Sequence, residues 1–203
     1  FFTADGGAVY AQNATADSNF GHGFAASIAG VIEASGFKST NNQGRGLSLY
    51  AGSAFYSAAG FVPAPVITGN YGDGVNAAYS SAAILSGATI TGNGAHPQFS
   101  GNGVGVYDAA SADVSDANVT ANDGAGITTW LGGMVNAPRS FANGNLRGNG
   151  YLAGAVSGID APGSEAKNNS GNGYEATHGG ALQATATYDF STNPATIVKR
   201  SVA

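Results

Sequence analysis

Apolar and polar residues alternate over short stretches of this chain. In segment 113–122, DVSDANVTAN, the apolar positions are Val114, Ala117 and Val119. Segment 83–93, AILSGATITGN, shows a similar spacing. Runs of this length with a period of two predict short β-strands. The pattern contains no amphipathic helix of useful length, so we expect an all-β protein.

Glycine and asparagine punctuate these runs. The pattern Asn-x-Gly-x-Gly-apolar occurs at 19–24, 42–47, 70–75 and 122–127, and a shortened Gly-Asn-Gly occurs at 92–94, 101–103, 148–150 and 171–173. Their asparagines serve as repeat markers: Asn19, Asn42, Asn70, Asn102, Asn122, Asn149 and Asn172. The shortest steps predict a repeat of about 22 residues, with insertions at some turns.

Short strands separated by such corners predict a single-stranded right-handed parallel β-helix over residues 1–190, with about seven or eight coils. We expect the corner glycines and asparagines to adopt positive φ, and the asparagines to bond along the coils as a ladder. The apolar residue after each corner should point inward: Phe24, Leu47, Val75, Val106 and Ile127. Residues 191–203 break the repeat, which suggests a C-terminal strand, a cap or a trimer contact.

Composition narrows the function. Of 203 residues 33 are Gly, charged residues make up 9%, and Cys is absent. An average domain has roughly 25% charged residues, so this is an unusual globular composition. A net charge of −5 with seven scattered Lys and Arg argues against nucleic-acid binding. No apolar run approaches the length of a membrane-spanning helix.

The segments SNFGHGFAASIAGVIEASG, GNGVGVYDAASADVSDANVTANDGAGI and NNSGNGYEATHGGALQATAT resemble right-handed β-helices of the pectate-lyase-like superfamily. Within it, they look most like the shafts of bacteriophage tail fibres and tailspikes, over roughly residues 7–190. Autotransporter passenger domains have a similar rhythm. The tail-fibre resemblance implies a homotrimer on a virion tail, attached to other tail proteins, that binds or cuts a bacterial surface polysaccharide. The autotransporter alternative implies an adhesin on a bacterial cell surface.

Tailspikes that cut glycans usually use paired carboxylates as acid and base. The densest group of acids here is Asp108, Asp113, Asp116 and Asp123, which would lie within about one coil. The alternative is that they are solvated turn carboxylates. Arg139 and Arg147 follow one coil later, but they form no dense cluster of the kind that a lyase needs. The sequence leaves enzymatic activity undecided and favours a binding protein over a glycan depolymerase.

Aromatic residues provide candidates for glycan binding. When the coils are aligned on the second corner glycine, Tyr50 and Trp130 fall at the same offset and Tyr79 lies one residue away. With Tyr107, they would form an exposed column on which sugar rings stack, unless they pack in the core or at a trimer interface. The histidines His22, His96 and His178 are isolated, so we expect no metal site and no cofactor.

Overall fold

The computed structural model describes residues 1–57, 63–94 and 101–184, and every element in these ranges is a β-strand. The strands form three sheets, which we call A, B and C. Sheet A contains β1 (Phe2–Thr3), β4 (Phe24–Ser27), β7 (Leu47–Tyr50), β10 (Val75–Ala77), β13 (Val104–Tyr107), β16 (Ile127–Trp130), β18 (Tyr151–Ala153) and β20 (Tyr174–Ala176).

Sheet B contains β2 (Ala8–Tyr10), β5 (Val31–Glu33), β8 (Ala54–Tyr56), β11 (Ala82–Ile84), β14 (Ser111–Asp113), β17 (Met134–Asn136), β19 (Gly158–Asp160) and β21 (Ala181–Gln183). Sheet C contains β3 (Thr15–Asp17), β6 (Lys38–Thr40), β9 (Val66–Thr68), β12 (Thr89–Thr91) and β15 (Asn118–Thr120). Isolated parallel bridges extend it from Asn118 to Phe141 and from Phe141 to Glu165.

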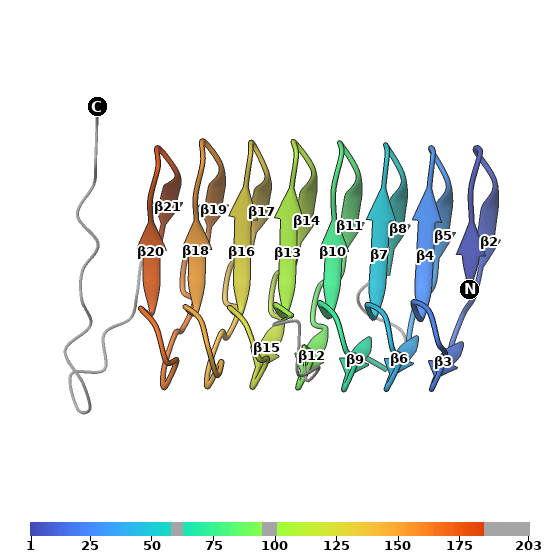
Figure 1. Ribbon diagram of the computed structural model, residues 1–203, viewed down its shortest axis with the longest axis horizontal. Coiled ribbons are helices and arrows are strands. Elements are labelled where there is room, and N and C mark those ends of the chain that lie inside the picture. Colours follow the sequence, from blue (N-terminus) through green and yellow to red (C-terminus); the bar gives the residue numbers. More distant parts are fainter. Residues whose placement is uncertain (58–62, 95–100, 185–203) are drawn as a thin grey trace.

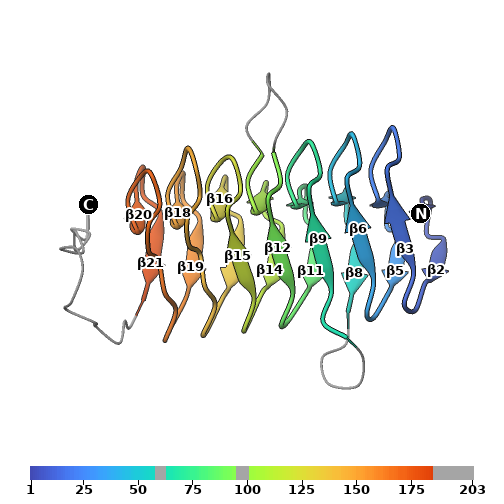
Figure 2. The ribbon, with the colours of Figure 1, turned by 90° about the horizontal axis from the view of Figure 1, so that it is seen from below.

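Each coil contributes one strand to sheet A and then one to sheet B before it passes along sheet C (Figure 1). All strand pairs among the described residues are parallel, and each joins equivalent residues of successive coils, such as Val75 with Val104. Sheets A and B have eight strands each, so the described residues form eight coils. Figure 2 shows the same stack from the side of sheet C. The parallel β-helix is therefore confirmed; its right-handed sense stays a prediction.

The interior is filled by alternate residues of every strand. In β7, Leu47 and Leu49 are fully buried while Ser48 faces outward. Equivalent positions stack along the axis, and the rings of Phe24, Phe37 and Phe55 meet edge to face near the N-terminal end. Burying each large side chain contributes roughly 1.5–3 kcal/mol, and the stacking repeats this gain in each coil.

An asparagine ladder runs along the corner between sheets C and A. Each ladder residue donates from its backbone N–H and its Nδ2 to the Oδ1 of the next, as from Asn42 to Asn70 at 3.1 and 2.8 Å. The members are Asn19, Asn42, Asn70, Asn93, Asn122, Asn145 and Asn169, in steps of 23, 28, 23, 29, 23 and 24 residues. The basic repeat is thus 23 residues.

The ladder confirms the expected asparagine stack but corrects three of its members. Asn102, Asn149 and Asn172 lie in a neighbouring outer row, where the N–H of Asn172 bonds the Oδ1 of Asn149 at 2.7 Å. Segment 169–174, NSGNGY, is itself a complete copy of the corner motif. Because Gly-Asn-Gly overlaps the longer motif, sequence spacing alone assigned the wrong asparagine.

The second glycines of the four Asn-x-Gly-x-Gly corners are required for close packing and not for positive φ, contrary to the sequence-based expectation, which is confirmed at Gly92 and Gly94 of the shortened motif. In Gly74, a Cβ would lie 2.6 Å from Ile90 and 2.8 Å from the ladder nitrogen of Asn93. Left-handed backbone occurs instead just before the ladder residue, as at Asn41 (φ 54) and Ala121 (φ 54). The chain therefore needs glycine where two coils approach most closely.

The inward positions after the corner are confirmed for Phe24, Leu47, Val75 and Ile127. In the fifth coil the equivalent residue is Val104, which pairs with Ile127, whereas Val106 occupies the second inward position, opposite Ala77. Because Gly103 and Gly105 are also one residue apart, they fit the corner pattern, and this moved the predicted inward residue from Val104 to Val106. The predicted C-terminal segment 191–203 lies outside the described residues, as does His96.

Candidate functional site

The corner between sheets A and B consists of two residues in left-handed conformation in each of the eight coils. The first positions are Asp5, Ile28, Ala51, Tyr79, Asp108, Leu131, Ala155 and His178. The second are Gly6, Ala29, Gly52, Ser80, Ala109, Gly132, Val156 and Gly179. This conformation costs an L-residue other than Gly roughly 1–2 kcal/mol, so nonglycine side chains here are retained against local strain.

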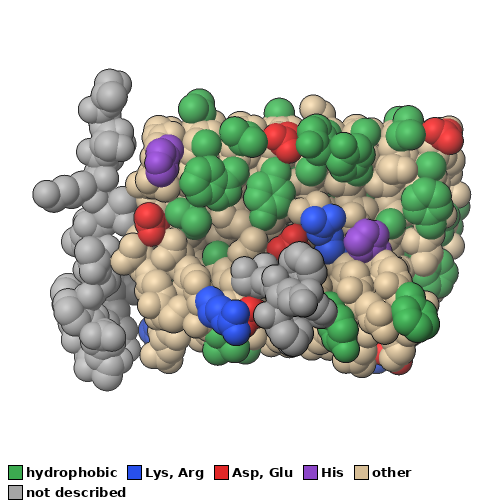
Figure 3. All heavy atoms as spheres, viewed as in Figure 1, with side chains coloured by type: hydrophobic (Ala, Val, Ile, Leu, Met, Phe, Trp, Pro, Cys, Tyr) green, Lys and Arg blue, Asp and Glu red, His purple; other side chains and the backbone are tan. Residues whose placement is uncertain are grey.

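Large apolar side chains nevertheless occupy this corner and the strand ends beside it. Ile28 is 56% exposed, Leu131 61% and Val156 78%, while Tyr50 and Tyr79 are each 50% exposed. Figure 3 shows hydrophobic side chains gathered along the upper edge of this face, where the chain passes from sheet A to sheet B. We call this surface the corner strip; it consists of Ile28, Tyr50, Tyr79, Tyr107, Asp108, Trp130, Leu131, Val156 and His178.

All four aromatic candidates from the sequence lie on the corner strip, in four consecutive coils. Tyr50, Tyr107 and Trp130 end β7, β13 and β16, and Tyr79 is a corner residue. Tyr107 and Trp130 are direct partners in the parallel ladder. Coils repeat about every 4.8 Å, so the strip is a continuous line parallel to the long axis.

The four rings differ in how far they are available to a ligand. Those of Tyr50 and Tyr79 contact each other at a centroid distance of 4.5 Å, with half of each residue exposed. The Trp130 ring lies over Gly154, where a Cβ would be 2.9 Å from its edge, and it reaches to 5.9 Å from the His178 ring. Glycine at 154 thus provides the space in which the indole lies flat along the strip.

Tyr107 is the least available member of the strip. Its ring folds back over Gly105, and its hydroxyl accepts a hydrogen bond from Asn102 Nδ2 at 3.1 Å. Burial, together with the nearby negative charge of Asp73, raises the pKa of Tyr107 far above its ordinary value. The Tyr107 ring therefore lies along the outside of sheet A towards Asn102 and offers less of its surface to a ligand than the other three rings.

The four carboxylates proposed from the sequence share one coil but lie at different places around it. Asp108 is on the A–B corner, Asp113 ends β14 in sheet B, Asp116 has positive φ beyond β14, and Asp123 follows the ladder residue Asn122. Asp123 pairs with Arg147 at 3.3 Å. Closeness in sequence thus does not bring all four acids to one surface, because each coil turns through three sheets.

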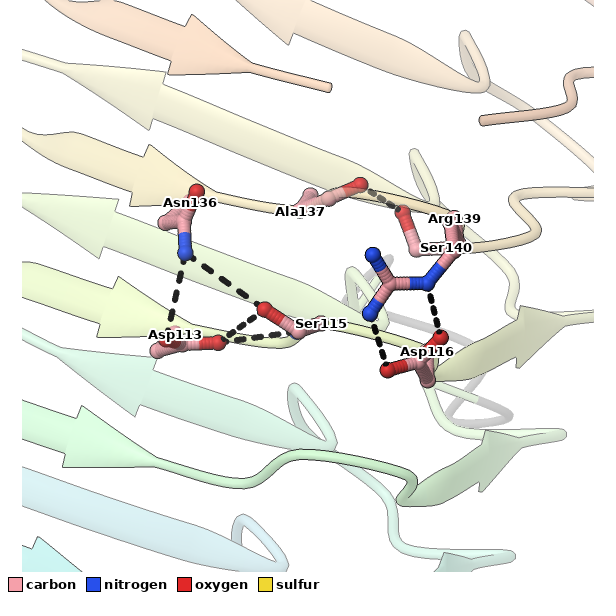
Figure 4. A network of polar contacts seen from close by, with 7 residues as sticks. All are labelled: Asp113, Ser115, Asp116, Asn136, Ala137, Arg139 and Ser140. Atoms are coloured by element: carbon pink, nitrogen blue, oxygen red, sulfur yellow. Dashed lines mark hydrogen bonds and ion pairs between the residues drawn. The ribbon is translucent and has the colours of Figure 1, made fainter. Parts of the chain in front are cut away.

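Asp113 and Asp116 are held by other groups (Figure 4). Partial burial alone would raise the pKa of Asp113, but hydrogen bonds from Ser115 and Asn136 bring it below its ordinary value. The two bonds from Arg139 to Asp116, both 2.7 Å, lower the pKa of that carboxyl. A general acid needs a raised pKa, so neither environment favours that role.

Asp73, which sequence reasoning did not select, has the opposite environment. Its side chain is only 13% exposed; burial raises its pKa, although the N–H of Asn102 and the guanidinium of Arg45 oppose this shift. Asn102 donates to Oδ1 at 2.8 Å, and Arg45 Nε lies 3.4 Å from Oδ2. In the sequence, Asp73 belongs to the corner motif NYGDGV, and nothing in that motif indicates that its side chain is buried.

Sequence reasoning also missed Ile28, Leu131, Val156 and His178 on the strip. Alignment on the inward apolar residues places Ile28, Leu131 and His178 at the same offset and Val156 one residue later. His22 lies elsewhere, where its Nδ1 accepts the N–H of Arg45 at 2.9 Å, and burial lowers its pKa, with a smaller contribution from Arg45.

Within the described ranges, no three His, Asp or Glu side chains are grouped so that they could hold a metal ion. The same ranges contain no helix that could span a membrane. No protein-family model, curated protein or solved structure matches this chain.

Proposed function

We propose that this chain is a rigid shaft segment of a virion tail fibre or tailspike that binds a bacterial surface polysaccharide along the corner strip. The observation that carries the proposal is the alignment of Tyr50, Tyr79, Tyr107 and Trp130 over four consecutive coils. Aromatic faces suit the C–H faces of sugars, and a line of them suits a linear polymer.

Strain at the corner supports a role in binding. Val156 is β-branched, has a φ of 60 and is 78% exposed, so neither backbone preference nor burial accounts for it. Glycine occupies the same position in four other coils, including Gly132 and Gly179, which shows that the corner accepts glycine. Strained residues of this kind cluster at functional sites.

The rest of the coil supports the role of a shaft. The core is continuous from Phe24 to Tyr151, and the asparagine ladder ties each coil to the next through buried amides. Solenoids of this type are stabilised mainly by contacts between neighbouring repeats. Such a rod holds the aromatic line at fixed spacing, so that little ordering is needed on binding.

Trp130 is the single tryptophan of the chain, so its fluorescence reports directly on the strip. Titration with a panel of purified bacterial surface polysaccharides should change this emission for at least one polymer. Tyr50→Ala should weaken that binding about tenfold while the reporter remains. Phe141→Ala removes an aromatic that is 44% exposed on sheet C and should leave it unchanged.

Absence of any fluorescence change and of co-sedimentation with every polymer would contradict glycan binding. An equal loss of affinity in the Tyr50→Ala and Phe141→Ala variants would show that the strip is not the binding surface.

Self-association belongs to the same proposal. The outer face of sheet B exposes Tyr10, Tyr56 and Ile84 in the N-terminal half, and we assign this face to contacts within a homotrimer. Light scattering over a dilution series should give a stable mass near three times 19.9 kDa. A stable monomer would contradict the trimeric tail protein and support the bacterial adhesin instead.

The alternative function is a glycan depolymerase, and Asp73 is the observation that favours it. A buried carboxyl with a raised pKa is the form in which a glycosidase holds its general acid. Incubation with each polymer that binds, followed by assay of new reducing ends, distinguishes the two functions. If new reducing ends are released by the parent protein and not by Asp73→Asn, the protein is a glycan depolymerase.

A further inference from the structure

We propose that the polysaccharide bound along the corner strip is uncharged. This inference rests on the proposed function and adds the chemical class of the ligand. It depends on where the charged side chains lie around the coil, which the alignment of aromatics does not determine.

Cationic side chains lie away from the exposed rings of the strip, and the one near the largely buried Tyr107, Arg45, is paired with Asp73. Five of the seven Lys and Arg fall in the described ranges: Lys38 on β6, Lys167 along sheet C, Arg139 between sheets B and C, and Arg45 and Arg147 between sheets C and A. None of these five belongs to the A–B corner. Figure 3 agrees, since the Lys and Arg side chains visible on this face lie below its hydrophobic edge.

Four of the five described cations are already held by acids. Arg45 lies 3.4 Å from Asp73, and Arg139 lies 2.7 Å from Asp116. The other two pairs are Arg147 with Asp123 at 3.3 Å and Lys167 with Glu165 at 2.7 Å. An acidic sugar on the strip would therefore find no guanidinium or ammonium there to replace its hydration.

The strip carries negative charge instead. Asp108 lies between Tyr79 and Leu131 in the corner row, as the bonds from Ser80 N to Asp108 O and from Ala109 N to Leu131 O show, both 3.0 Å. The charge of Asp108 acts on the neighbouring Tyr79 ring. The pKa of Tyr79 is raised, mainly by Tyr50 and to a smaller extent by Asp108. Asp5 adds a further acid at the N-terminal end of the same row.

These positions select against anions by repulsion. Carboxylate, sulfate or phosphate groups on a polymer would lie beside Asp108, and the chain as a whole carries a formal charge of −5. A neutral sugar stacks on the tyrosines and Trp130 without electrostatic repulsion from Asp108, and its hydroxyls can both donate and accept hydrogen bonds. Salt should consequently have little effect on binding.

The test uses matched pairs of polymers: dextran with dextran sulfate, hydroxyethylcellulose with carboxymethylcellulose, and neutral with acidic polymers from the surface panel. Binding is followed by Trp130 fluorescence at low and high salt, at about pH 8, where histidines are ordinarily neutral. Neutral members that bind should keep their affinity as salt rises. Their acidic counterparts should bind at least about threefold more weakly at low salt and recover at high salt.

Asp108→Asn removes the charge and keeps a residue that tolerates left-handed backbone. It should reduce the ratio between the affinities for neutral and acidic polymers by about twofold to fivefold. The matched control Asp160→Asn removes the same charge from the exposed end of β19 in sheet B and should change nothing.

Binding of acidic or cationic polymers that equals or exceeds that of neutral ones would overturn this inference and leave glycan binding intact. A panel without any binder would overturn the proposed function itself. Equal effects of Asp108→Asn and Asp160→Asn would assign the selectivity to the overall charge of the protein and overturn the role given to the strip.

Discussion

The rings of Tyr50 and Tyr79 contact each other between consecutive coils in a tilted arrangement, with centroids 4.5 Å apart and planes inclined by 56°. Tyr50 is the last residue of β7, whereas Tyr79 is a corner residue with a φ of 54. The two are not ladder partners, because β7 and β10 pair Leu49 with Ala77, which places Tyr50 opposite Ala78. The left-handed corner therefore makes the contact possible.

This contact should be detectable by titration. The negative charge of ionised Tyr50, followed by that of Asp108, raises the pKa of Tyr79, so Tyr50→Phe should lower it towards the ordinary value. Ring-carbon NMR of the tyrosines over an alkaline titration measures the change. Tyr10→Phe, on the outer face of β2, is the control and should leave Tyr79 unaffected. An unchanged Tyr79 pKa in Tyr50→Phe would contradict the contact between the two rings.

Val156→Gly should separate stability from binding. It relieves left-handed strain at an exposed residue and should raise the free energy of unfolding by about 1 kcal/mol, while it weakens polysaccharide binding. Val31→Gly, in the interior of sheet B, should lower that free energy by about 1 kcal/mol. Urea unfolding followed by circular dichroism measures both. Destabilisation by Val156→Gly would show that its side chain packs against the solenoid.

Asn93→Ala tests the asparagine ladder. The variant loses the oxygen that accepts both the backbone N–H and the Nδ2 of Asn70, at 3.2 and 2.9 Å, in a buried environment. We expect the free energy of unfolding to fall by about 2–4 kcal/mol. Asn102→Ala, outside the ladder, removes the bonds with Ala125 and Tyr107 and should cost about 1 kcal/mol. Equal costs in urea unfolding would contradict the distinction between the two rows.

Gly74→Ala tests the close approach of coils. The added Cβ would meet Ile90 at 2.6 Å and a backbone oxygen of Gly103 at 2.7 Å, so we expect a loss of about 2 kcal/mol or more. Gly21→Ala is the matched control, because no atom lies within 4 Å of the new Cβ and its φ is not positive. Thermal unfolding compares the two variants. A stable Gly74→Ala protein would show that the coils can separate at this corner.

Asp73→Asn should change how stability depends on pH. Burial raises the folded pKa of Asp73 above its unfolded value, so its contribution to stability is present at low pH and is lost as pH rises through the folded pKa. Asn keeps an oxygen for the N–H of Asn102 and removes the buried charge. The gain of the variant over the parent protein should therefore increase from about pH 4 to neutrality. Urea unfolding at several pH values measures it, and a gain that shrinks with pH would contradict the sign.

The predicted residues of the core were largely correct. Stacks of apolar residues after the second corner glycine require only that equivalent positions recur, and Phe24, Leu47, Val75 and Ile127 all lie inside. Errors arose where the short Gly-Asn-Gly pattern overlaps the longer motif, so that Asn102, Asn149 and Asn172 were assigned to the ladder. The Gly103–Gly105 pair likewise put Val106 in the place of Val104 in the alignment.

The sequence by itself determined the repeat, the parallel stacking and the presence of an aromatic column, because each depends on residues that recur at equivalent positions of successive coils. Only the tertiary structure decided which side of the coil each charge occupies. Asp108, Asp113, Asp116 and Asp123 are close along the chain but are carried around three sheets, whereas Tyr50 and Trp130 are distant along the chain and share one edge. In a solenoid, nearness in space follows the position within the coil, and that position was known only once the inward residues and the turns between them had been placed.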